Sequence, residues 1–478
     1  MKKISLMLVT IVLFLFLVAS CHGRLVPKDD IQTVKDFEVP ETFDESKDIQ
    51  ITFWAKNDTN KIQQEIFNKA VDAFEGLYPN VHITVVQYSD YTNIYSDVIT
   101  NISTNTTPNA SIAYPDHVAT YMEGNNVIVP LDALMEDEKY GLGGSALKFN
   151  SVKKEEIQPK FLSECLIQDR YCILPFMRSS EALYVNKSYL EENGFSIPEV
   201  FTWEYIWEVS EYAKKKAEAE QKIMIPLIYK STDNMFIQLC KQNDFDYTTS
   251  KGKVLFLSDE VSQMLLDLVP PIENGYFDTF KRVSYPGNYF NKGQCIFAID
   301  STAGATWLGS KAPLIDIPAS ELVDFETIVT TIPQVNPKNP QMISQGPSMC
   351  LFYKEDPQEV LATWLFMQYL LTFETQMSFS KTEGYLPVTR TVVDSKEFQE
   401  YLKNEAEYEV KRMATKLIID NIDHTFVTPV FNGSSLCRSA SGYLIEAMFN
   451  KKFRDAASIK ELFSLVDKRY KLSTYEKS

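Results

Sequence analysis

The sequence predicts an α/β protein made of two lobes, each a sheet flanked by helices, and two observations support this. Residues 49–86 read as strand, helix and strand, and such a βαβ unit belongs to a parallel sheet with helices on its faces. The chain has 478 residues, of which 458 follow Ser20, and this exceeds the size at which one hydrophobic core keeps growing. Because 45% of the residues are hydrophobic, two large cores can be filled.

The first 21 residues have the pattern of an export signal. Lys2 and Lys3 precede an apolar run over residues 4–17, and small residues then lead to Cys21. This order resembles a bacterial lipobox, so we expect residues 1–20 to be a signal peptide and Cys21 to carry lipid. The alternative is a transmembrane anchor, but the run is shorter than the roughly 20 residues of a spanning helix. The expected location is the bacterial cell envelope, on the extracytoplasmic face of a membrane, with the lipid as anchor.

Residues 21–48 are mostly polar or charged and contain scattered prolines. This composition is typical of a tether between a lipid and a folded domain. The folded part is expected to begin near residue 48.

The strands and helices follow from hydrophobic periodicity. Residues 49–54 alternate as a strand does, and residues 81–86 supply a second strand. The helix between them shows an apolar stripe with a spacing of four residues, at Ile62, Ile66, Ala70 and Phe74. Further helices are expected at residues 202–216, 355–372 and 459–470.

Composition excludes some partners. The formal net charge of -17 argues against binding to nucleic acid or to an anionic membrane surface, so the membrane link is assigned to the lipid on Cys21. The six other cysteines have no CxxC spacing, which weighs against a zinc or redox centre. We expect no metal and no cofactor.

Cys165 and Cys172 form the one cysteine pair of interest. A two-residue turn at Gln168 and Asp169 would place the two cysteines opposite each other on adjacent strands. A cross-strand disulfide then becomes an option in an oxidising envelope. The alternative, two buried thiols, stays open because connectivity does not follow from sequence.

Residues just after the first strand are candidates for ligand contact. In open α/β sheets ligands bind beyond the carboxyl ends of the strands, where Trp54 and Asn57 lie. The alternative is that Trp54 packs in the core and that the polar residues only turn the chain toward the helix.

Several segments, taken in order, resemble the extracellular solute-binding proteins of family 1, the receptors of carbohydrate importers of the ATP-binding-cassette (ABC) class. The similarity extends over nearly the whole mature chain, and the shared order is more specific than any one segment. The segments are residues 51–54, 74–81, 113–116, 174–176, 183–187, 198 with 202–203, 290–295, 345–348 and 383–388.

The resemblance implies a two-lobe periplasmic-binding-protein-like fold in which the chain crosses three times between the lobes. The crossings match residues 178–182, 296–301 and 344–349. One lobe would then comprise residues 48–178 plus 300–345, and the other 182–296 plus 349–478. Gly346, Ser179 and Ser180 suit the hinges, where a few residues absorb the dihedral change of closure.

The implied function is a lipid-anchored monomeric receptor that binds a mono- or oligosaccharide between the lobes and delivers it to an ABC permease. Sugars have flat apolar faces edged by hydroxyl groups, which aromatic rings, amides, carboxylates and guanidinium groups recognise. The candidate ligand-binding residues are Trp54, Asn57, Tyr91, Asp116, Arg178, Ser180, Asp300, Thr302, Trp307, Gln345, Gly346, Tyr385 and Asn432. The alternatives are that Tyr91 and Trp307 pack in the interior and that Asp116 and Asp300 cap helices.

The chain departs from family members that bind glycerol phosphates. Those members carry an arginine-bearing segment near the C terminus, whereas the matching residues 430–435 contain no cation, and the first one is Arg438. Because a phosphate needs charge-assisted contacts, this departure disfavours a phosphorylated ligand, although Arg178 or Lys56 could supply such contacts.

Other functions are disfavoured or left open. An enzyme is disfavoured because the chain has four histidines and lacks GxSxG, HExxH and Gly-rich phosphate-loop motifs. A sensing or adhesion lipoprotein with the same fold, or a receptor for a polyol or glycerol phosphate, remains an alternative.

Overall fold

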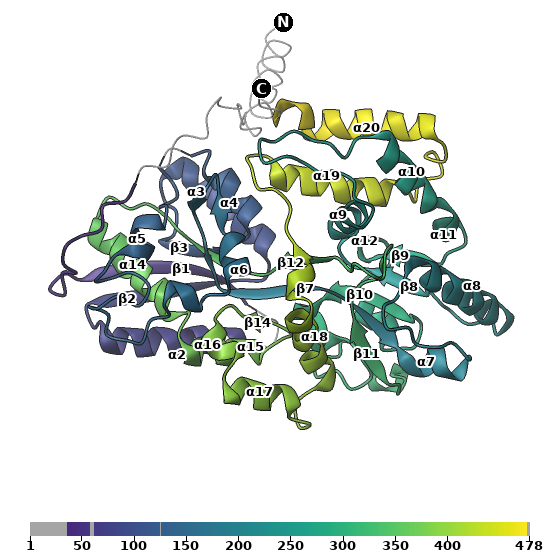
Figure 1. The fold of residues 1–478 in the computed structure, drawn as a ribbon, viewed down its shortest axis with the longest axis horizontal. Coiled ribbons are helices and arrows are strands. Elements are labelled where there is room, and N and C mark those ends of the chain that lie inside the picture. The colour runs from purple at the N-terminus through teal and green to yellow at the C-terminus, as the bar shows by residue number, and fades with distance from the viewer. Residues whose placement is uncertain (1–35, 58–61, 125, 476–478) are drawn as a thin grey trace, which may run out of the picture. The chain divides into compact units, whose positions relative to one another are not determined.

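Two sheets, each with its own hydrophobic core, organise the protein (Figure 1). The computed structural model describes residues 36–57, 62–124 and 126–475, all within one unit of the chain. Cys21 and the expected signal peptide lie outside the described residues. The predicted α/β class is confirmed, since helices flank both sheets.

The first sheet has the strand order β2-β1-β3-β13-β6. Strands β1 and β2 pair in parallel from Ile49↔Val81 onward, and β3 joins β1 in parallel while β13 runs antiparallel to β3 and β6. The strands are β1 (Ile49–Lys56), β2 (Val81–Tyr88), β3 (Ala110–Ala113), β6 (Leu174–Pro175) and β13 (Ser348–Leu351). Helix α2 (Ile62–Leu77) links β1 to β2, so the predicted βαβ unit is confirmed.

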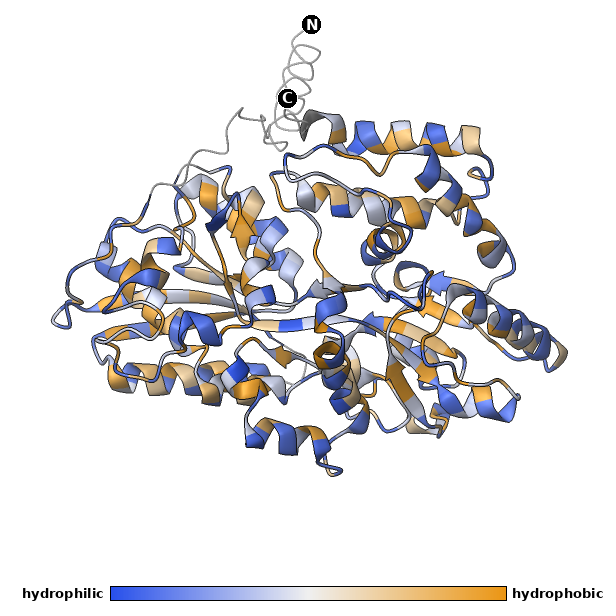
Figure 2. Ribbon diagram, in the orientation of Figure 1, coloured by the Kyte–Doolittle hydropathy of each residue, from blue (hydrophilic) through white to orange (hydrophobic). Residues whose placement is uncertain are grey.

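The core of this first lobe is rich in aromatic rings. Phe53 of β1 lies 5.7 Å, between ring centroids, from both Phe67 and Phe366. Both partners are fully buried and come from helices that cover the sheet. Its helices include α3 (Tyr91–Thr104), α14 (Pro357–Tyr369) and α15 (Phe373–Ser380). In Figure 2 hydrophobic and hydrophilic segments alternate along the helices that surround the sheets.

Strand β7 (Met177–Asn186) connects the two lobes, and all ten of its residues are buried. Its first residues pair with β14 (Leu386–Pro387), and the following Ser179 and Ser180 pair with β12 (Met342–Gln345). Its last residues pair with β10 (Phe297–Ser301) and β11 (Thr327–Thr330). Met177 belongs to the first core and Leu183 to the second, so this strand carries the chain from one lobe to the other.

The second sheet has the order β15-β12-β7-β10-β8-β9. Its remaining strands are β8 (Leu227–Tyr229), β9 (Phe277–Thr279) and β15 (Thr425–Phe426). The main helices of this lobe are α8 (Trp203–Ala219), α9 (Thr232–Gln242), α10 (Asp259–Asp267), α19 (Ser434–Ala447) and α20 (Ala456–Tyr470). The helices predicted at residues 202–216, 355–372 and 459–470 are confirmed as α8, α14 and α20.

The shorter helices complete the chain. They are α4 (Pro115–Tyr121), α5 (Asp132–Glu136), α6 (Pro159–Ser163), α7 (Lys187–Glu192), α11 (Val269–Glu273), α12 (Phe280–Val283), α13 (Pro286–Phe290), α16 (Arg390–Val393), α17 (Lys396–Lys403) and α18 (Glu409–Asp420).

The strand pairing corrects the expected division into lobes. Residues 300–345 belong with the second sheet, because β11 and β12 both pair with β7 there. Residues 348–401 belong to the first lobe, because β13 pairs with β3 and α14 packs on β1. Residues 296–301 are not a crossing: residues 297–301 form β10, a strand inside the second sheet. The chain instead returns to the second lobe between Tyr401 and β15.

Gly346 lies where the chain leaves β12 for β13. Its φ is 128°, a value that L-residues rarely adopt. A Cβ at this position would overlap the carbonyl oxygen of Met177 and lie 2.7 Å from the Cα of Arg178. Glycine therefore allows the crossing to pass directly against β7.

The predicted hairpin around the two cysteines is present. Strand β4 (Leu166–Ile167) pairs antiparallel with β5 (Arg170–Tyr171), and Gln168 and Asp169 both have positive φ, 53° and 61°. This is the backbone of a type I′ turn. Cys165 and Cys172 are buried free thiols in the structure, so the optional disulfide is not formed.

Candidate functional site

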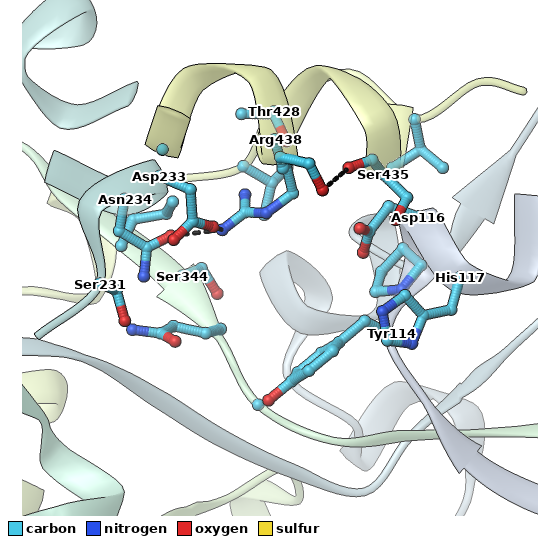
Figure 3. A pocket seen from close by; sticks show the side chains of 18 of the residues that line it. Tyr114, Asp116, His117, Ser231, Asp233, Asn234, Ser344, Thr428, Ser435 and Arg438 are labelled. Atoms are coloured by element: carbon cyan, nitrogen blue, oxygen red, sulfur yellow. Dashed lines mark hydrogen bonds and ion pairs between the residues drawn. The ribbon is translucent and has the colours of Figure 1, made fainter. Parts of the chain in front are cut away.

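A pocket of ≈ 550 Å³ lies between the two lobes and is lined from both (Figure 3). Its walls come from the carboxyl end of β3, the start of α9, the face of α19 and the crossing after β12. The lining residues are Thr92, Tyr95, Tyr114, Pro115, Asp116, His117, Glu164, Arg178, Lys230, Ser231, Thr232, Asp233, Asn234, Lys281, Ile343, Ser344, Gln345, Gly346, Val427, Thr428, Val430, Ser435, Arg438, Ser439 and Gly442.

The first lobe supplies an aromatic wall. Tyr114 directly follows β3 and is the N-cap of α4, which begins at Pro115. The ring of His117 in α4 lies 4.6 Å, between centroids, from that of Tyr95 in α3. Tyr114 contacts His117 edge to face at 5.4 Å. Burial lowers the pKa of His117, with Asp116 opposing this effect, so the imidazole is neutral near pH 7. The wall thus presents uncharged ring faces to the pocket.

Asp116 lies in the first turn of α4, on the side of the pocket opposite Asp233 and Asn234 (Figure 3). Among the residues that the structure describes, no side chain or backbone N–H donates a hydrogen bond to its carboxylate. A ligand in the pocket would therefore find a charged acceptor on the first lobe.

Arg438 of α19 faces Asp116 from the second lobe. Its Nη2 donates to Asp233 Oδ2 at 2.8 Å and also to Asn234 Oδ1. Burial opposes the charge of Arg438, but Asp233 and Asp116 outweigh it and raise its pKa. The arginine remains charged and is held against the first turn of α9.

Close packing of α19 on α9 fixes this geometry. Gly442 of α19 lies so near α9 that a Cβ would approach Thr232 Oγ1 to 3.1 Å and Asp233 N to 3.2 Å. A larger side chain would push the helices apart and separate Arg438 from Asp233.

Behind this pair a buried carboxylate continues the polar network. Glu181 of β7 is 1% exposed and accepts hydrogen bonds from Tyr229 Oη at 2.7 Å, Asn234 Nδ2 at 3.0 Å and Gln238 Nε2 at 2.5 Å. Desolvation raises the pKa of Glu181 to about 8, although Tyr229 and Asn234 act to lower it. Asn234 therefore connects the crossing strand to Arg438.

The floor of the pocket contains a buried ion pair. Arg178 Nε donates to Glu164 Oε2 at 3.0 Å, with side chains 3% and 6% exposed. Its other nitrogens donate to the carbonyl oxygens of Phe161 and Pro347 and to Ser348 Oγ. Ser344 Oγ donates to Glu164 Oε2 at 2.8 Å. Arg178, itself on the crossing strand β7, thus ties the first lobe to the crossing at Gly346.

Two buried polar atoms of lining residues have no hydrogen-bond partner within the described part of the chain. They are Glu164 Oε1, an acceptor, and Gln345 Nε2, a donor. Buried polar atoms are normally paired, so these two are exceptions in the packing beside the pocket.

The structure brings together four of the residues predicted for ligand binding, namely Asp116, Arg178, Gln345 and Gly346. Tyr91 lies one layer behind, with its ring 4.5 Å from that of Tyr114, and Tyr385 forms a hydrogen bond with it.

The remaining predicted residues are not among the pocket lining. Trp54 packs on Tyr88 at 5.3 Å, and Asn57 accepts a hydrogen bond from the N–H of Gln64. The others make these contacts: Ser180 with Thr302 and the Ile343 carbonyl, Asp300 with Lys230, Trp307 with Tyr285, and Asn432 with Glu123. Trp54 is 8% exposed, which fits the core alternative.

Sequence reasoning did not select Tyr95, Tyr114, Asp233 or Arg438. A signal existed for Asp233, because it follows β8 in the same way that Asp116 follows β3. Arg438 has no such signal, since it lies inside a helix 205 residues from Asp233.

Neither a metal site nor a membrane span is evident in the part of the chain that the structure covers. Residues 36–57, 62–124 and 126–475 contain no group of three or more side chains suited to hold a metal ion. Within the same ranges no helix has both the length and the apolarity to cross a bilayer.

Comparison with known proteins gives a family and a fold. The family model described as "Bacterial extracellular solute-binding protein" matches residues 69–406. A search of curated proteins finds no sequence relative.

Solved structures share the fold at low identity. UgpB from Mycobacterium tuberculosis, in complex with glycerophosphocholine, aligns with TM-score 0.67 at 16% identity over 88% of this chain and 97% of that one. Lmo0181 from Listeria monocytogenes, in complex with cycloalternan, aligns with TM-score 0.67 at 16% identity, over 88% of this chain and 98% of that one. The sugar-binding protein MalE from Xanthomonas citri aligns with TM-score 0.67 at 16% identity, over 89% of this chain and 98% of that one.

Proposed function

Because the chain belongs to the bacterial extracellular solute-binding proteins, we propose that it is a receptor that binds a mono- or oligosaccharide in the pocket between its lobes and delivers it to an ABC permease. The observation that carries the choice of ligand is the combination of an aromatic wall with polar groups that accept and donate. Sugars match this combination, since their rings have apolar faces and their hydroxyl groups both donate and accept.

The individual contacts support this proposal. Tyr95 and Tyr114 offer ring faces, and the Asp116 carboxylate is open to ligand hydroxyl groups. Lmo0181, solved in complex with cycloalternan, and the sugar-binding protein MalE share the fold.

Binding would bring the lobes together. The ligand contacts Asp116 from the first lobe and residues of α9 and α19 from the second, so it has more contacts when the lobes are near each other. A ligand shifts a conformational equilibrium only through such differential affinity. The permease would then recognise the closed, loaded form.

A thermal-shift screen of the protein against neutral mono- and oligosaccharides, polyols and glycerophosphocholine tests the proposal. A ligand at 100 times its Kd should stabilise the protein by about 2.7 kcal/mol. Asp116→Asn should lower the affinity for the most strongly stabilising neutral sugar by about tenfold or more, because hydrogen bonds to a charged group are among the stronger ones. Affinity is measured by titration calorimetry.

The control is Asp267→Asn, which changes the same side chain on the exposed end of α10 away from the pocket. It should leave affinity unchanged. Stabilisation by no neutral sugar would contradict the proposed ligand class, and equal affinities of the Asp116 and Asp267 variants would contradict the assignment of Asp116.

Lipid anchoring at Cys21 is a second part of the proposal and depends on the sequence pattern alone. In a bacterial host the full chain should partition into the detergent phase of a Triton X-114 extraction, since acyl chains add about 0.8 kcal/mol per buried methylene. Cys21→Ser should move it to the aqueous phase. If the variant stays in the detergent phase, Cys21 is not the anchor.

A further inference from the structure

Charged side chains enter the pocket mainly as ion pairs. Arg178 pairs with Glu164 at 3.0 Å, Lys230 with Asp300 at 2.8 Å and Arg438 with Asp233 at 2.8 Å. These cations are 3%, 32% and 24% exposed. Lys281, at the pocket edge, is exposed to solvent, where water and salt screen its charge. The enclosed part of the pocket therefore presents no unbalanced positive charge.

Arg438 is the cation best placed to meet an anionic ligand. In Figure 3 its guanidinium group is turned toward Asp233 and Asn234, and Asp116 lies on the other side of the pocket. Guanidinium groups bind carboxylate and phosphate with the same N–H groups, and the Nη2 of Arg438 already donates to Asp233 and Asn234. A phosphate would have to compete with a carboxylate that belongs to the protein.

The carboxylates also repel an anion directly. Asp116 on the first lobe and Asp233 on the second both line the pocket, so a phosphate near Arg438 would lie close to two like charges. An uncharged hydroxyl group has no such penalty, and it can donate to either carboxylate.

We infer that Asp233 sets the charge selectivity of the pocket: by pairing with Arg438 and neutralising its charge, it makes the protein select uncharged solutes and reject phosphate and its esters. This inference rests on the proposed function, because it narrows the ligand class of the same pocket. Asp233 acts here as a specificity-determining residue, through Arg438.

The test is titration of the mature protein with inorganic phosphate at low ionic strength. The wild type should show no saturable binding at millimolar concentrations. Asp233→Asn, which removes the negative charge paired with Arg438 while keeping the side-chain shape, should bind phosphate at least about tenfold more tightly than the wild type. Asp233→Ser, which also removes the negative charge, is the second variant should the asparagine variant fold poorly.

Two controls identify Arg438 as the site. The double variant Asp233→Asn/Arg438→Gln should return phosphate binding to the wild-type level. Glu273→Gln removes the charge paired at 2.7 Å with Arg454, which is 20% exposed and lies outside the pocket. This variant should gain no phosphate binding.

The inference is overturned if the wild type binds phosphate as tightly as the Asp233 variants, or if these variants gain no more than Glu273→Gln does. Its failure is distinct from failure of the proposed function, which is decided by the response of the wild type to neutral sugars.

Discussion

Replacing Arg178 by methionine is expected to lower the free energy of unfolding by about 3–5 kcal/mol. The guanidinium and its partner Glu164 are 3% and 6% exposed. Methionine fills much of the same space but leaves Glu164 without its cation and removes the hydrogen bonds to Phe161, Pro347 and Ser348. An uncompensated buried charge is among the costliest defects in a protein interior. Urea unfolding followed by circular dichroism measures the change.

Two controls separate charge from volume. Arg282→Met removes an arginine that is 44% exposed and paired with Asp278, and exposed pairs of this kind contribute about 0–1 kcal/mol. The double variant Arg178→Met/Glu164→Met removes both charges, so it should recover much of the lost stability. A single variant as stable as the wild type would show that the ion pair does not hold the crossings together.

Replacing Glu181 by glutamine is expected to abolish a large part of the pH dependence of stability. In the folded protein, desolvation raises the pKa of Glu181 from 4.5 to about 8. Between these pH values the folded state keeps a proton that the unfolded state has lost, so the free energy of unfolding falls as pH rises. The fall attributable to this group is on the order of 4 kcal/mol, since one pKa unit corresponds to about 1.36 kcal/mol.

The measurement is the difference in unfolding free energy between Glu181→Gln and the wild type at pH 5, 6, 7, 8 and 9. This difference should grow in favour of the variant up to pH 8 and then level off. For Glu397→Gln, at an exposed position on α17, the free energy of unfolding should change with pH as it does in the wild type. If the free energy of unfolding of Glu181→Gln also changes with pH as the wild type does, Glu181 is ionised in the folded protein across the whole pH range.

Local pattern predicted the elements of this fold, and long-range pairing decided how they assemble. The stripe Ile62, Ile66, Ala70 and Phe74 predicted α2, and alternation predicted β1 and β2, because periodicity records which face is buried. Nothing periodic in residues 327–330 tells that β11 runs antiparallel to the end of β7. The lobe boundaries were therefore wrong for residues 300–345, even though the number of lobes was right.

The same limit applies to the site. Asp116 follows β3, and the rule that ligands bind beyond strand carboxyl ends applies there. The rule gave Trp54 equal weight, but β1 has β2 on one side and β3 on the other, and the ring of Trp54 packs on Tyr88 of β2. The pocket forms instead at β3, beside the antiparallel strand β13 that leads out of the crossing.

Arg438 shows a different kind of limit. In the sequence Arg438 is the first cation after residues 430–435. The absence of a cation within those residues argues against a phosphate ligand. The structure places Arg438 in the pocket wall and pairs it with Asp233. A cation is therefore present in the pocket, and its pairing with Asp233 decides whether it can bind phosphate.

Strand β7 has a consequence for how the protein opens to solvent. Its ten residues are buried, and its backbone pairs with strands of both lobes in turn. A backbone amide at the centre of β7 can exchange its hydrogen only when the hydrogen bonds to β12 or β10 break. Breaking them also disturbs the first core, because β7 begins in that core. Slow exchange should therefore be shared by β7 and both sheets, so that the two lobes behave as a single cooperative folding unit, although each has a core of its own.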